Sequence, residues 1–150
     1  MEERFSTEEL IFMMKKLSLN MTAQLELNLK NKSITGIQAY FLVYILRHHP
    51  KGTYLTELFR EIGVSKPTLS ALIKKLREKG YLNFEEDPAD VRKKKVLPTE
   101  KLLAEGDRFI EKAGRMESEI CSVLNRQEKV QLMNLEEKLL MQFDRMEQNE

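Results

Sequence analysis

The sequence has little of what secreted, membrane-spanning or disulfide-stabilised proteins require. A single cysteine among 150 residues excludes an internal disulfide framework and favours a reducing compartment. No apolar run approaches the roughly 18 residues that a membrane span needs, and the acidic start MEERFSTEEL does not resemble a signal peptide. We therefore expect a soluble, cytoplasmic protein with no membrane partner.

Catalytic and metal-binding patterns are also missing. The sequence has no phosphate-binding loop, no nucleophile with an orienting base and no metal-ligand spacing. His48 and His49 are adjacent, so on a helix their side chains would point about 100° apart and could not easily chelate one ion. We expect no enzymatic activity, no cofactor and no bound metal.

The charges nearly cancel over the whole chain but are unevenly distributed along it. The net charge is only +1, which excludes a basic field around the whole molecule. A surface for nucleic acid would therefore need local segregation of charge. Residues 66–95 contain nine Lys and Arg against five Asp and Glu, whereas residues 127–150 contain three against six. Basic residues are thus concentrated in the middle of the chain.

Helical periodicity is the strongest pattern that the sequence does contain. Apolar residues recur at helical spacing, and Gly, Pro and capping residues mark the ends of the segments. We expect helices over residues 7–30, 35–49, 54–62, 65–79, 99–124 and 125–146, and strands over 81–86 and 93–97 joined by a loop over 87–92. This order predicts a mainly α protein with a small β-wing.

Residues 54–97 have the proportions of a winged helix-turn-helix. A short helix is followed by a turn through Gly63, and Ser65 is a suitable N-cap for a second helix that tolerates Pro67 in its first turn. The two strands that follow would form the wing. The apolar stripe of the second helix, which would face the core, consists of Leu69, Leu72, Ile73 and Leu76.

The residues opposite this stripe suit DNA recognition. A recognition helix reads base edges near its N-terminus, where small polar side chains allow close approach and lysines neutralise phosphates. A single lysine-rich helix is usually only a solvated surface, but a helix, turn, helix and basic hairpin in this order favour double-stranded DNA. The candidate DNA contacts are Ser65, Lys66, Pro67, Thr68, Ser70, Lys74 and Lys75 on the helix, and Asp90, Arg92, Lys93 and Lys94 in the wing.

The chain resembles the MarR family of transcriptional regulators. The resemblance rests on ITGIQAYFLVYI before the motif, LTELFREIGVSKPTLSALIKKLREKGYL within it, and Asp90-Val91-Arg92 in the wing. It implies a homodimer that binds a pseudo-palindromic operator, usually as a repressor, and that is often released by a small anionic or aromatic ligand. It also implies that residues 35–98 form the DNA-binding region, and that 1–34 and 99–150 form a helical dimerisation region.

The resemblance gives Arg92 a specific role at the wing tip. An arginine there would enter the minor groove and sense its width. Asp90, two residues earlier, would hold the guanidinium or the loop through a planar pairing that lysine reproduces poorly. The alternative is an exposed surface pair of little energetic value.

Several positions depart from the family pattern. Ala71 and Phe84 stand where arginines are common, which removes basic contacts. Leu97-Pro98-Thr99 inserts a proline, and Leu102 lies near the place of a usual glycine. These changes leave the apolar pattern intact, but we expect them to shift the preferred DNA sequence or to weaken binding.

Other interpretations concern residues outside the motif. Tyr40, Tyr44 and Arg47, on the helix that would face the dimerisation region, are candidates for a small-ligand site. Cys121 is expected to be a buried structural thiol rather than a redox sensor. A winged helix can also serve as a protein-interaction scaffold that binds no operator, although a scaffold would not need a basic helix and wing.

Overall fold

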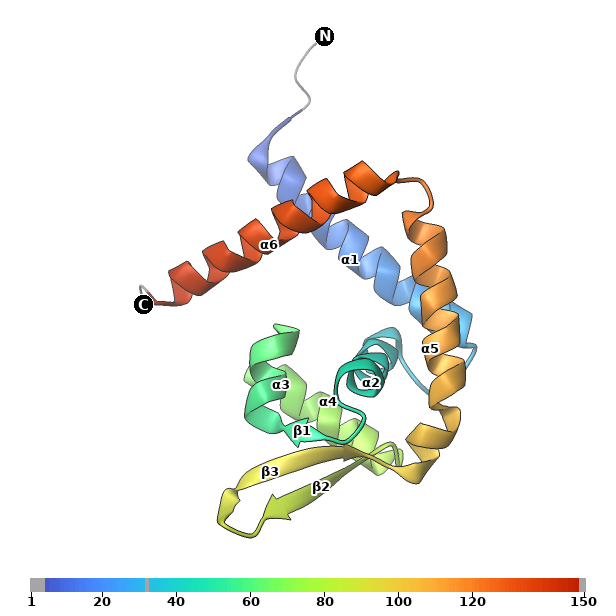
Figure 1. Ribbon diagram of the computed structural model, residues 1–150, viewed down its shortest axis with the longest axis vertical. Helices are drawn as coiled ribbons and strands as arrows, with labels where there is room; N and C mark the ends of the chain where they lie inside the picture. The colour runs from blue at the N-terminus through green and yellow to red at the C-terminus, as the bar shows by residue number, and fades with distance from the viewer. Residues whose placement is uncertain (1–4, 32, 149–150) are drawn as a thin grey trace. The chain divides into compact units, whose positions relative to one another are not determined.

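The protein is described by a computed structural model that covers residues 5–31 and 33–148, with the backbone alone for Val91 and Arg92. These residues form six helices and three strands (Figure 1). The chain divides into two compact units between Gly114 and Arg115. In chain order the elements are α1 (Thr7–Leu29), α2 (Gly36–His48), β1 (Thr53–Tyr54), α3 (Leu55–Ile62), α4 (Lys66–Glu78), β2 (Leu82–Asp87), β3 (Asp90–Pro98), α5 (Glu100–Cys121) and α6 (Arg126–Gln148).

The predicted mainly α fold with a small β-wing is confirmed. The strands form one antiparallel sheet in the order β1-β3-β2, and the hairpin of β2 and β3 extends away from α3 and α4 (Figure 1). Strand β1 was not predicted, because its two residues pair only with Val96 and Lys95 far along the sequence. Within the described part of the chain, no helix is both long enough and apolar enough to cross a membrane.

The prediction of a loop over residues 87–92 is wrong. Strand β2 continues to Asp87 and β3 already begins at Asp90, so Arg92 belongs to a strand. The backbone N–H of Ala89 donates to Asp87 Oδ1 at 2.8 Å. This side-chain hydrogen bond stabilises a turn of two residues between the strands. The wing is therefore a longer and tighter hairpin than the Asp-Pro sequence indicated.

The core of the first unit is built around α2. A capping box begins the helix: the Gln38 backbone N–H donates to Thr35 Oγ1 at 3.3 Å, and the Thr35 N–H donates to Gln38 Oε1 at 3.1 Å. Phe41 and Ile45, on the following turns, are completely buried. The other large, fully buried side chains are Leu42, Leu58, Leu69, Ile73, Leu76, Leu82, Val96 and Leu102. Every helix from α2 to α5 and both wing strands thus contribute to the interior.

The C-terminal end of α4 is anchored by hydrogen bonds to distant parts of the sequence. Lys79 Nζ donates to Gln38 Oε1 at 2.7 Å and also to the backbone carbonyl of Ser33. Just beyond the helix, the Tyr81 hydroxyl donates to Glu105 Oε2 of α5 at 2.9 Å. Burial, and then this bond, raise the pKa of Tyr81. These contacts fix the end of α4 against α2 and α5, and so determine which way its exposed face points.

Helices α1 and α2 approach each other closely at a glycine. A Cβ atom on Gly36 would lie against the backbone carbonyl and the side chain of Thr22, so only glycine permits this crossing. Near it, Leu25 and Leu29 of α1 are buried. The C-terminal part of α1 therefore belongs to the core of the first unit.

Most of the other apolar residues of α1, and all those of α6, are exposed. Helix α6 buries none of its described residues. On this helix the positions 132, 135, 139, 143 and 146 fall on one side, as in an amphipathic helix. The large exposed apolar residues are Leu10, Ile11, Phe12, Met13, Leu17, Leu19, Met21 and Leu27 on α1, and Val130, Leu132, Met133, Leu135, Leu139, Leu140, Met141, Phe143 and Met146 on α6.

Candidate nucleic-acid interface

The turn between α3 and α4 is built by a glycine and a serine. Gly63 ends α3 with a φ of 83°, a left-handed conformation that a side chain would strain. Ser65 then caps α4, because its Oγ accepts from the backbone N–H of Thr68 at 3.3 Å. The same Ser65 hydroxyl donates to Thr68 Oγ1 at 2.8 Å. The predicted cap is confirmed, and both hydroxyls lie at the N-terminal end of the helix.

Helix α4 has one buried face and one exposed face. Leu69, Leu72, Ile73 and Leu76 are buried, as their spacing predicted. The opposite side places all the candidate helix contacts in solvent. The exposed residues there are Ser65, Lys66, Pro67, Thr68, Ser70, Ala71, Lys74 and Lys75. A small polar surface at the start of the helix is therefore followed by two lysines.

The wing is less basic in space than its run of lysines indicates. In the β2–β3 register, Lys94 lies opposite Glu86 and Lys95 lies opposite Glu85. Directly opposite side chains share one face of a sheet, so each of these lysines is accompanied by a carboxylate. The sequence could not show this pairing, because it depends on where the turn closes.

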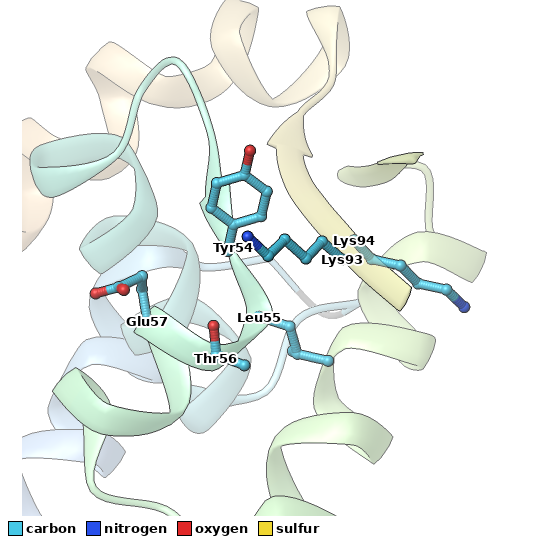
Figure 2. Close-up of a pocket in the computed structure, with 6 residues that line it drawn as sticks. All are labelled: Tyr54, Leu55, Thr56, Glu57, Lys93 and Lys94. Atoms are coloured by element: carbon cyan, nitrogen blue, oxygen red, sulfur yellow. The ribbon is translucent and has the colours of Figure 1, made fainter. Parts of the chain in front are cut away.

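The two lysines at the wing's edge also line a pocket beside α3. Lys93 and Lys94 line it together with residues of β1 and of the first turn of α3 (Figure 2). Figure 2 shows the two lysine side chains leaving β3 in opposite directions, as alternation along a strand requires. The other residues that line the pocket are Tyr54, Leu55, Thr56 and Glu57.

The predicted pair at the wing tip is only partly described. Asp90 begins β3 directly after the turn and is half-buried. The backbone of Arg92 lies two residues further along the same strand, and its side chain is outside the described part of the structure. The proposed pairing of Asp90 with Arg92 therefore stays a prediction.

Three cations of this region lie over aromatic rings. Lys66 Nζ is 5.0 Å from the centre of the Phe59 ring, at the start of α4. The Arg77 guanidinium carbon is 4.3 Å from the Phe84 ring centre, and Lys94 Nζ is 5.3 Å from the same centre. Sequence reasoning missed Arg77, although it follows Ser70 and Lys74 at helical spacing and this could have revealed it.

The candidate ligand residues on α2 do not form an empty site. Tyr40 and Arg47 are exposed, and the half-buried Tyr44 hydroxyl donates to Glu61 Oε2 of α3 at 2.6 Å. His49 Nε2 lies 2.7 Å from the same carboxylate oxygen. Burial, and then Glu61, raise the pKa of Tyr44, while hydrogen bonds from Tyr44 and His49 lower the pKa of Glu61. These residues link α2 to α3, and their role in ligand binding stays a prediction.

Two other sequence interpretations concern thiol and metal chemistry. Cys121, expected to be buried, is exposed at the end of α5, so the expectation of a buried thiol is wrong for the single chain. Neighbouring Ser122 and Val123 are exposed as well. Among the described residues, no three His, Cys, Asp or Glu side chains are grouped as metal ligands.

The arrangement of these elements defines a winged helix-turn-helix. Two helices are joined by a tight turn, the second exposes a polar and basic face, and a β-hairpin follows it directly. The model of the MarR family matches residues 32–93, from the start of α2 into the wing. The winged helix-turn-helix of this chain thus matches the model of the family that the sequence resembles.

Solved MarR-type regulators share the fold over nearly the whole chain. The MarR protein from Peptoclostridium difficile is 24% identical, has a TM-score of 0.81, and the match covers 97% of this chain and 94% of that one. MepR from S. aureus, solved in complex with DNA, is 24% identical with a TM-score of 0.78, covering 93% of this chain and 99% of that one.

A third neighbour is Bordetella bronchiseptica BpsR, whose DNA binding is regulated by 6-hydroxynicotinic acid. It is 19% identical with a TM-score of 0.74, covering 87% of this chain and 98% of that one. No curated protein matches the sequence. At these identities the neighbours establish the fold.

Proposed function

We propose that the protein is a homodimeric transcriptional repressor that binds a pseudo-palindromic operator, with α4 in the major groove and the wing in the adjacent minor groove. The observation that carries this proposal is the exposed face of α4, where small polar residues precede Lys74 and Lys75. Such a face allows close approach to base edges while its cations contact phosphates. The complex of the neighbour MepR with DNA supports the proposal.

A second copy of the chain is the partner that the exposed apolar residues favour. Monomeric proteins rarely expose large contiguous apolar patches, and α1 and α6 each expose at least eight large apolar side chains. Two-fold symmetry would then place the two α4 helices on half-sites whose centres are roughly 10 bp apart. The self-complementary operator follows from that symmetry.

A small anionic or aromatic effector is proposed to release the protein from DNA. The support is the neighbour BpsR, which 6-hydroxynicotinic acid regulates. On this chain the candidate contacts for such an effector are Tyr40, Tyr44 and Arg47 of α2. The Tyr44 hydroxyl already donates a hydrogen bond to Glu61. Titration with 6-hydroxynicotinic acid, followed by the loss of operator binding, is a first probe.

The decisive experiment is a selection of bound sequences from random duplex DNA, followed by titration on the selected operator and on a scrambled duplex. If the dimer contacts about 6–10 phosphates, operator affinity should fall by about 10³–10⁵ between 50 and 200 mM salt. Lys74→Ala should weaken both duplexes equally and make the salt dependence shallower. Arg92→Ala should cost roughly 1–3 kcal/mol on the operator, and Arg92→Lys should recover only part of it.

Lys138→Ala provides the matched control, because it removes the same charge from an exposed position of α6. It should leave both affinities unchanged. If no sequence is enriched and binding does not respond to salt, the protein is not an operator-binding regulator. The protein-interaction scaffold would then be the better interpretation of the winged helix.

A further inference from the structure

We propose that Arg77, Phe84 and Lys94 form a phosphate-binding cluster that joins the end of α4 to the wing, with Phe84 as its positioning residue. This inference rests on the DNA binding proposed above. It adds a contact that neither the helix positions nor the wing tip predicted. Its chemical partner is the phosphate backbone of the duplex between the two grooves.

One aromatic ring brings together two cations from separate elements. Arg77 comes from the last turn of α4, while Phe84 lies on β2 and Lys94 on β3. The guanidinium carbon is 4.3 Å and the ammonium nitrogen 5.3 Å from the ring centre, and both are within the roughly 6 Å reach of a cation–π interaction. The ring therefore gathers positive charge at the junction of helix and wing.

Arg77 lies on the same side of α4 as the proposed DNA contacts. Ser70, Lys74 and Arg77 have the spacing i, i+4, i+7, and all three are exposed. Arg77 thus extends the DNA-facing stripe by one turn, towards the hairpin. A guanidinium that stacks on a ring keeps its N–H groups in its own plane, where they can donate to phosphate oxygens.

Phe84 is the position at which the sequence indicated a loss of charge. An arginine there would place a third cation beside Arg77 and Lys94 and repel both. A half-buried phenyl ring instead attracts both cations and restricts their motion. The phenylalanine therefore changes how positive charge is arranged at this junction, besides removing one unit of it.

One carboxylate opposes the cluster and provides a control. Glu86 lies opposite Lys94 in the register and two residues after Phe84, so it shares their face of the hairpin. Glu85, opposite Lys95, belongs to the other face. Glu86→Gln removes negative charge beside the cluster, whereas Glu85→Gln removes the same charge from the other side.

The test is a titration of the full-length variants on the selected operator and on scrambled duplex at several salt concentrations. Arg77→Ala should weaken both duplexes about five- to tenfold and reduce the salt slope by about 1 per subunit. Arg77→Lys should restore the slope but only part of the affinity, because lysine lacks the planar guanidinium group. Glu86→Gln should tighten binding about twofold, and Glu85→Gln should not.

Phe84 is tested by coupling to Arg77. Phe84→Leu keeps an apolar side chain without the ring and should weaken binding about two- to fivefold, whereas Phe84→Trp should retain wild-type affinity. In the Arg77→Ala background, Phe84→Leu should have a smaller effect. A merely structural phenylalanine would give the same loss in both backgrounds. Thermal melting of each variant checks folding, and the Arg77 variants still test the cluster if Phe84→Leu does not fold.

The outcomes separate this inference from the proposed function. Wild-type protein that binds no duplex overturns both. Wild-type protein that binds its operator, while Arg77→Ala keeps the same affinity and salt slope, overturns the cluster alone. Full additivity of Arg77→Ala and Phe84→Leu removes the positioning role of the ring.

Discussion

Helix α2 and helix α6 both carry apolar residues at helical spacing, yet α2 buries most of its residues whereas α6 buries none. Phe41 of α2 is 0% exposed, and side chains from α3 to α5 share the interior with it. Phe143 lies on an apolar stripe of α6 and is 59% exposed. A periodic apolar stripe thus predicts that one face of a helix will be covered, but not by what.

This difference has a measurable consequence. Contacts inside the first unit stabilise the chain whatever its concentration. Contacts of α6 with a second copy would add stability only as the dimer forms, by mass action. Substitutions in the two helices should therefore differ in how their effect depends on protein concentration.

Phe41→Ala is expected to have the largest effect on stability. Deleting most of a fully buried phenyl ring costs about 3–5 kcal/mol, through lost burial and the cavity left behind. Urea unfolding at two protein concentrations should give the same loss at both. Phe143→Ala removes the same atoms from α6, and its cost should appear only at the higher concentration. Equal, concentration-independent losses from the two substitutions would contradict the comparison.

Leu139→Asp should weaken self-association without unfolding the winged helix. Leu139 lies on the apolar stripe of α6 and is 41% exposed in the single chain. Burying an unpaired carboxylate at a dimer interface should raise the dissociation constant about a hundredfold or more. Analytical ultracentrifugation measures this change. Asn134→Asp adds the same charge on a different side of the helix and should have little effect, and a wild-type monomer at micromolar concentration would rule out the interface.

Local chemistry made much of the first unit predictable. The Ser65 cap depends on residues three apart, and the buried stripe of α4 on residues within two turns. The turn at Gly63 requires a left-handed backbone conformation, which glycine adopts without strain. Helix α4 and its exposed candidate contacts could therefore be located from the sequence.

Contacts between distant residues were not predictable in the same way. The Lys79 side chain donates a hydrogen bond to Gln38, which is 41 positions away in the sequence. Tyr44 donates one to Glu61, which is 17 positions away. The position of Arg77 over the Phe84 ring depends on the angle between helix and hairpin. Strand β3 began earlier than expected because one Asp side chain tightened the turn. Each of these features depends on tertiary geometry that no sequence window contains.

The smallest expected effect concerns the pH dependence of the first unit. The Glu61 carboxylate accepts hydrogen bonds from Tyr44 and His49, and these bonds lower its pKa below the ordinary 4.5. A lowered carboxyl pKa contributes stability that is fully present above the ordinary value and is lost as the pH falls through the lowered one. Wild-type stability should therefore decline below about pH 4.5 partly through this group.

Glu61→Gln should remove that part of the acid sensitivity while costing less than about 1 kcal/mol at neutral pH, because Glu61 itself is exposed to solvent. Thermal melting between pH 3 and 7 should give a shallower decline for the variant than for the wild type. Glu57→Gln is the control, since its carboxylate lies on the same helix, 3.8 Å from Arg60 and outside the cluster. Tyr44→Phe should reproduce part of the Glu61→Gln effect by removing one of the two donors. The same variants combined with Phe143→Ala should show an unchanged pH profile, because the cluster belongs to the first unit. If Glu61→Gln and Glu57→Gln flatten the decline equally, the hydrogen bonds from Tyr44 and His49 do not set the acid response.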